Sequence, residues 1–137
     1  SLARQLAQVR CEGGHTPIAR LLRNALEEHR KLPIRALVFI GDALEEDPDT
    51  LCQLAGQCGM RQLPLFLFQE GGDATVRETF RSMAKVSRGA YARFDGSSAG
   101  TLAALLGAVA AYAAGGRAAL ENNRSESAKL LLQQLNN

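Results

Sequence analysis

Two kinds of apolar pattern alternate along the chain. Runs of consecutive or alternating apolar residues at 36–40, 63–68 and 90–94 are typical of buried strands, the last alternating as an edge strand does. Before each of these runs, apolar residues recur every three or four positions, over 17–31, 47–59 and 73–88, which predicts amphipathic helices. Alternation of strands and helices predicts an α/β fold in three layers: a mostly parallel, Rossmann-like sheet of about three strands with helices on both faces.

Local signals mark where these helices begin. Thr16 followed by Pro17 is a typical helix start, with threonine as N-cap and proline at the first helical position. Asp47 before Pro48 repeats the pattern, and Asp73 is the predicted N-cap of the third helix.

The two ends of the chain are less regular. Residues 2–9 have near-helical apolar spacing, which predicts a short helix, and residues 11–15 are a predicted loop. Residues 101–114 form a helix that is apolar nearly all round, so we expect it to be well buried until Gly115 and Gly116 break it. We expect residues 1–116 to form the α/β domain. Residues 117–137 would be a helical tail that packs on it or on a partner through Leu130, Leu131 and Leu135.

Composition narrows the class of protein. The chain has 137 residues, 46% of them hydrophobic and 22% charged, as in a globular domain. A net charge of +2 and the lack of Trp favour neither nucleic acid nor an anionic membrane as partner. The longest apolar stretch, 102–114, is shorter than the roughly 20 residues that span a bilayer. Three cysteines without Cys-x-x-Cys spacing indicate reduced thiols, hence a cytoplasmic protein.

Acidic residues follow each predicted strand. Asp42 directly ends the first, with Glu45 and Glu46 close behind, while Glu70 and Asp95 follow the second and third. The carboxyl ends of parallel strands meet at one edge of a sheet, where ligands bind in open α/β folds. Thr16 would face Asp42 across that edge, and hydroxyl and carboxylate oxygens suit a hard cation such as Mg²⁺.

Simpler interpretations compete with this one. Asp47 and Asp73 are explained by helix capping alone, and Thr16 is explained equally well as a cap or as a ligand. Residues 13–16, Gly-Gly-His-Thr, lack the Gly-Lys-Ser/Thr ending of a phosphate loop. Cys11 and His15 are close in sequence, but nucleophilic catalysis also needs a third group that orients them. The Asp-x-Ser at 95–97 follows the last predicted strand and is explained by a turn with a helix cap.

Four strings together resemble a known family. They are Gly-His-Thr at 14–16, Val-Phe-Ile-Gly-Asp-Ala-Leu-Glu-Glu at 38–46, Phe-Leu-Phe-Gln-Glu-Gly at 66–71 and Ala-Tyr-Ala-Ala-Gly-Gly at 111–116. The chain resembles the later portion of a von Willebrand factor A-type domain, in particular that of a group of bacterial cytosolic proteins. The resemblance implies a metal-ion-dependent adhesion site for Mg²⁺ or Mn²⁺. Thr16 and Asp42 would be ligands, directly or through water, and a partner's carboxylate would complete the shell.

The main motif of that site, Asp-x-Ser/Thr-x-Ser, is absent upstream of Thr16, and residues 1–15 contain no Asp. We therefore expect a truncated domain that lacks the first strand and, in this chain alone, holds no metal tightly. The lost strand would leave the edge of residues 36–41 bare, which predicts a homodimer through that edge.

The resulting hypothesis is a non-enzymatic protein-interaction module with a partial metal site at Thr16 and Asp42. Its binding face would include Gly14, His15, Gly41, Glu45 and Glu70. Two alternatives stay open: a small metal-dependent phosphohydrolase or nucleotide-binding protein that uses Asp42, and a structural assembly subunit with a vestigial site.

Overall fold

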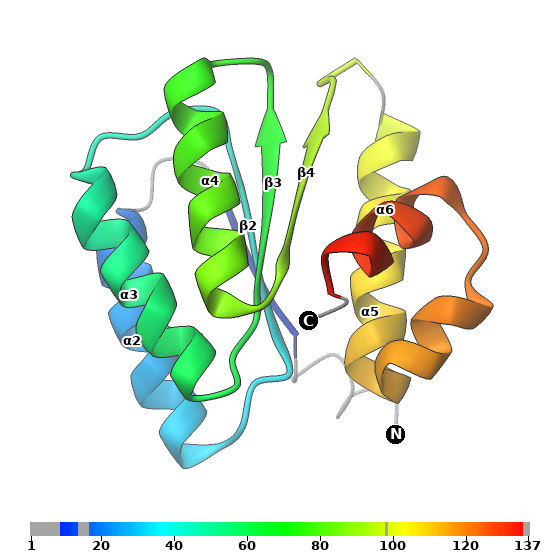
Figure 1. The fold of residues 1–137 in the computed structure, drawn as a ribbon, viewed down its shortest axis with the longest axis horizontal. Coiled ribbons are helices and arrows are strands. Elements are labelled where there is room, and N and C mark those ends of the chain that lie inside the picture. The colour runs from blue at the N-terminus through cyan, green and yellow to red at the C-terminus, as the bar shows by residue number, and fades with distance from the viewer. Residues whose placement is uncertain (1–8, 14–16, 98, 136–137) are drawn as a thin grey trace.

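A computed structural model describes residues 9–13, 17–97 and 99–135. Its centre is a parallel sheet whose strands follow one another in sequence order (Figure 1). The strands are β1 (Val9–Gly13), β2 (Ala36–Gly41), β3 (Leu65–Glu70) and β4 (Ala90–Phe94). The predicted α/β architecture with a parallel sheet is confirmed, with four strands rather than about three.

Helices cover both faces of the sheet, as predicted. The helices α2 (Ile18–Lys31), α3 (Pro48–Met60) and α4 (Ala74–Ser87) connect successive strands and share one face. Right-handed crossovers between strands in sequential order place every connecting helix on the same side. The helices α5 (Ala99–Asn122) and α6 (Glu126–Gln134) follow the last strand and cover the opposite face.

The sheet is buried on both sides because its strands send alternate side chains to two cores. Leu37 and Phe39 pack toward α2, α3 and α4, while Val38 and Phe66 pack toward α5 and α6. Each core contains an edge-to-face aromatic pair: Phe39 with Phe80 at 5.9 Å between ring centroids, and Phe66 with Tyr112 at 5.7 Å.

The first strand corrects two predictions. Val9, placed in a helix by its spacing, begins β1, and residues 11–13 are strand rather than loop; residues 1–8 lie outside the described part. The edge of β2 is not bare, since β1 pairs with it in parallel from Val9 opposite Ala36 to Gly13 opposite Ile40. An apolar strand edge carries backbone N–H and C=O groups that need partners, and this short segment supplies them. A homodimer stays a prediction, but the predicted pairing of two copies along this edge of β2 is wrong, because β1 occupies the edge.

Helix α5 is buried along one face only, contrary to the expectation from its composition. Leu105, Ala108 and Val109 are buried, whereas Ala103 and Ala110 are exposed. By length and composition alone, this helix is also apolar enough to cross a membrane; of its most apolar 18-residue stretch, 22% is buried inside the structure. The predicted break is present, because Gly116 leaves helical geometry at φ 69° and ψ −159°.

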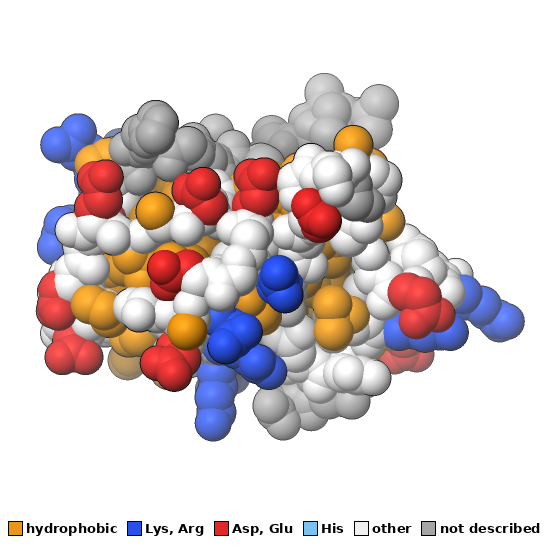
Figure 2. Space-filling model, turned by 90° about the horizontal axis from the view of Figure 1, so that it is seen from above, with side chains coloured by type: hydrophobic (Ala, Val, Ile, Leu, Met, Phe, Trp, Pro, Cys, Tyr) orange, Lys and Arg blue, Asp and Glu red, His pale blue; other side chains and the backbone are white. Residues whose placement is uncertain are grey.

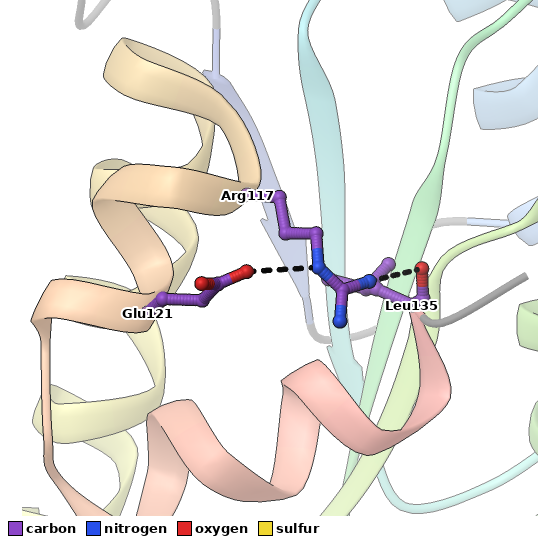
Figure 3. A network of polar contacts seen from close by, with 3 residues as sticks. All are labelled: Arg117, Glu121 and Leu135. Atoms are coloured by element: carbon purple, nitrogen blue, oxygen red, sulfur yellow. Dashed lines mark hydrogen bonds and ion pairs between the residues drawn. The ribbon is translucent and has the colours of Figure 1, made fainter.

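Helix α6 is held by polar contacts as well as by apolar packing. Leu131 is buried and Leu135 packs against the same core, but Leu130 is 41% exposed, so its predicted docking is wrong. Beyond the kink in α5, the guanidinium of Arg117 donates to Glu121 Oε1 at 3.0 Å and to the Leu135 carbonyl at 3.3 Å (Figure 3). The end of α6 is thereby tied to the second half of α5.

Candidate functional site

The carboxyl ends of the four strands form one edge of the molecule, and acidic residues gather there. Figure 2 looks down on this edge and shows several carboxylate side chains across it. Asp42 and Glu45 follow β2, Glu70 ends β3, and Asp95 follows β4; all four are exposed. The predicted grouping of these strand-end acids at one edge is thus present.

Asp42 directly follows the last residue of β2. The preceding residue, Gly41, is half-buried and pairs with Gln69 of β3. A Cβ on Gly41 would lie 2.7 Å from Cε2 of Phe39, whose ring is buried and packed against Phe80. A larger residue at position 41 would therefore have to displace the packed Phe39 ring.

Glu46 holds the acidic loop against helix α2. Its carboxylate accepts hydrogen bonds from the backbone N–H groups of Ile18, at 2.6 Å, and Ala19, at 2.7 Å. These are among the N–H groups that a helix start leaves without intrahelical partners, and a carboxylate also complements the helix dipole.

The helix start therefore differs from the prediction. Pro17, rather than the predicted Thr16, is at the N-cap position of α2, and its side chain makes no capping bond; Thr16 itself lies outside the described residues. A carboxylate 28 residues away in the sequence accepts from an N–H group at this helix start. Sequence reasoning grouped Glu46 with its acidic neighbours, and no local motif signals this long-range role.

Both flanks of the Gly-His-Thr segment are fixed beside β2 and its loop. Gly13 pairs with Ile40, two residues before Asp42, and Ile18 is bonded to Glu46. Gly14, His15 and Thr16 themselves lie outside the described residues. The pairing of Thr16 with Asp42 stays a prediction, but the chain enters and leaves this segment at the required edge.

The remaining acids at the edge have local structural roles. Asp47 accepts from the Thr50 N–H at 3.2 Å and Asp73 from the Val76 N–H at 3.0 Å, which confirms both as N-caps. Glu70 lies against the loop after β4, since a Cβ on Gly96 would meet its carboxylate at 2.0 Å.

Asp95 forms a turn with the residue two positions on. It accepts from the Ser97 N–H at 3.0 Å, as the turn interpretation predicted. This bond, with one to the Ser97 side chain and the nearby charge of Arg93, lowers the pKa of the Asp95 carboxyl below its ordinary value. Arg93 donates to the Gly71 carbonyl at 2.6 Å and so joins the loops after β3 and β4.

A buried polar pair lies beneath these loops and was missed from the sequence. Gln69 is fully buried; its Oε1 accepts from the Tyr91 hydroxyl at 2.5 Å, and its Nε2 donates to the Asp73 carbonyl at 3.0 Å. Burial raises the pKa of Tyr91, although Arg77, Arg81 and Arg93 act against it. The pair fixes the loop after β3 relative to β4.

The oxygen atoms at this edge are of the kind that bind a hard metal ion. Among the described residues no three His, Cys, Asp or Glu side chains are grouped to hold one. Asp42 offers hard oxygen donors at the predicted position, and the hydroxyl of Thr16 is the second donor that the resemblance implies. Two such ligands fit Mg²⁺ or Mn²⁺ in kind but not in number.

Comparison with protein-family models, with curated proteins and with solved structures finds no match for this chain. The von Willebrand A resemblance therefore rests on the four sequence strings alone and stays a prediction.

Proposed function

We propose that the protein is a non-enzymatic interaction module of von Willebrand A type, with a partial metal-ion-dependent adhesion site at the carboxyl ends of its strands. The observation that carries the proposal is the bidentate contact of Glu46 with the start of α2. It fastens the loop that bears Asp42 to the chain that immediately follows Thr16. The loop that bears Asp42 and the start of α2 are thereby held together at one edge, which supports the pairing that the resemblance implies.

The exposure of this edge favours a binding face over a catalytic cleft. Asp42, Glu45 and Glu70 are all exposed, whereas enzymes usually enclose their reacting groups in a concave, water-poor site. Three grooves in the described part lie between α2 and α3, beside α4 and α6, and at the amino ends of β2 and β3. Asp42, Glu45 and Glu70 line none of these three.

Binding at this face would depend on a divalent cation. A bound Mg²⁺ or Mn²⁺ would supply positive charge for a carboxylate on the partner protein. Asp42 would hold the ion with Thr16, and Glu45 and Glu70, as exposed neighbours, would set the charge that the partner meets. Because the chain offers so few ligands, we expect the ion to bind weakly until the partner's carboxylate joins it.

Calorimetric titration of Mg²⁺ and Mn²⁺ tests the metal assignment. We expect weak, saturable binding to the protein and its loss in Asp42→Ala. Asp49→Ala is the matched control, because Asp49 is an exposed acid in the first turn of α3. Equal affinity in the protein and in Asp42→Ala would refute the assignment. Stabilisation by nucleotides or phosphate esters with Mg²⁺, lost in Asp42→Ala, would favour the enzyme alternative.

A further inference from the structure

A second charged feature lies at the start of β4, away from the acidic edge. It is a groove of about 300 Å³ between the end of α4 and the end of α6. Three cationic side chains line it, Arg81, Lys85 and Arg88, and Gly89, Gln134 and Leu135 complete its walls. We call this feature the cationic groove.

The charges in the cationic groove are not neutralised within the described part of the chain. Arg81, Lys85 and Arg88 form no ion pair with another described residue, and none of the described residues that line the groove is acidic. Cations near a helix C-terminus also complement the helix dipole, which accounts for Lys85 and Arg88 but acts only within the last turn. Arg81 lies one turn earlier, so the dipole does not explain why all three line one hollow.

Two walls of the cationic groove are already fixed by Tyr91. The guanidinium of Arg81 lies over the Tyr91 ring, 5.6 Å from its centroid. The side-chain amide of Gln134 accepts from the Tyr91 N–H and donates to the Tyr91 carbonyl, both at 2.7 Å. Arg81 and Gln134 are therefore held in place before a ligand binds, which lowers the entropy that these two side chains lose on binding.

Arg88 occupies a position that suits glycine or asparagine. It caps α4 in the left-handed region, at φ 64° and ψ 31°, which is unfavourable for a residue with a long side chain. A cation thus lines the groove despite the backbone preference, and unfavourable backbone conformations of this kind cluster at functional sites.

We propose that the cationic groove binds a small phosphate-bearing ligand. Two guanidinium groups and an ammonium offer several donors to phosphate oxygens, and arginine matches phosphate geometry in particular. The volume of about 300 Å³ is at the lower end of that of small-molecule sites and fits a compact ligand. Leu135 and Gly89 give one wall without charge, where a compact organic group would pack. This site is separate from the proposed metal-dependent face.

Inorganic pyrophosphate, titrated calorimetrically, is the probe. The double variant Lys85→Gln/Arg88→Asn removes two of the three charges, and we expect at least tenfold weaker binding. Asparagine tolerates the left-handed conformation, so the thermal midpoint should not fall and a loss of binding will not reflect unfolding. The control Arg20→Gln/Lys31→Gln removes the same charge from exposed positions on α2, and its affinity should stay within twofold.

Other outcomes would overturn the proposal. Citrate that binds as tightly as pyrophosphate, or an equal loss in the α2 control, would show unselective charge attraction. Absence of saturable binding at millimolar pyrophosphate would also overturn it. Amide shift changes on titration should centre on Gly89 and Tyr91; changes centred on Asp42 would assign the anion to the other edge.

Discussion

Glu46 illustrates how one side chain can hold together the edge where we propose that a partner binds, without being part of the proposed binding surface. Its two charge-assisted hydrogen bonds stabilise the start of α2 and keep the loop after β2 in place. The consequence extends to Asp42, since that residue lies between β2 and this anchor. At the residue scale, Asp42 is thus the proposed ligand, and Glu46 is the residue that positions its loop.

Glu46→Ala tests this positioning role. The substitution leaves two N–H groups at the start of α2 without their partner, so the free energy of unfolding should fall by about 1–2 kcal/mol. Urea denaturation measures the change. Glu45→Ala is the matched control, because Glu45 is exposed in the same loop and should change stability by less than about 0.5 kcal/mol. Equal effects would contradict the role given to Glu46.

Side-chain hydrogen bonds between residues close in the sequence were predictable, and those between distant residues were not. Asp47 and Asp73 were identified as caps because the bonds they accept come from residues three positions ahead. The partners of Glu46 lie 27 and 28 residues away, and those of Gln69 include Tyr91, 22 residues away. Nothing in the residue types near Glu46 or Gln69 indicates such partners, because the fold alone brings them together.

At the scale of elements, β4 lies last in the order of the sheet and so presents an edge. Edge strands carry N–H and C=O groups that attract other strands. The side-chain amide of Gln134 occupies part of this edge, since it pairs with both backbone groups of Tyr91 as a neighbouring strand would. Helix α6 thus protects the edge through a side chain.

Gln134→Ala should open this edge locally. Loss of the two hydrogen bonds leaves the Tyr91 N–H to solvent, so hydrogen exchange of that amide should accelerate at least tenfold, which corresponds to about 1.4 kcal/mol. Gln133→Ala, in the neighbouring exposed position on α6, is the control. Unchanged exchange at Tyr91 in Gln134→Ala would show that the amide is protected by something other than this side chain.

The elements themselves were predictable to different degrees. The pattern predicted two strands and three helices correctly: β2, β3, α2, α3 and α4. A strand that is buried on both faces is a continuous apolar run, and a helix that is buried on one face has a periodic apolar stripe. The short segment of β1 has no such pattern. It is a strand because it pairs with the edge of β2. In helix α5 the exposed face consists of small residues such as alanine, so the sequence did not distinguish that face from a buried one.

At the scale of the whole molecule, sequential strand order separates the functions we propose. The carboxyl ends of all four parallel strands share one edge, where Asp42 and the other strand-end acids lie. The cationic groove lies beside Gly89, at the amino end of β4. A ligand of opposite charge is therefore expected at each end of the sheet: a cation with a partner protein at one, a small phosphate at the other.

Relaxation enhancement by substoichiometric Mn²⁺ tests the central claim, that a divalent cation binds at the carboxyl edge between Asp42 and the start of α2. We expect the amide signals of Gly13, Ile18, Gly41 and Asp42 to broaden first, and we expect this broadening to disappear in Asp42→Asn. Broadening centred on the caps of α3 and α4, unchanged by Asp42→Asn, would contradict it.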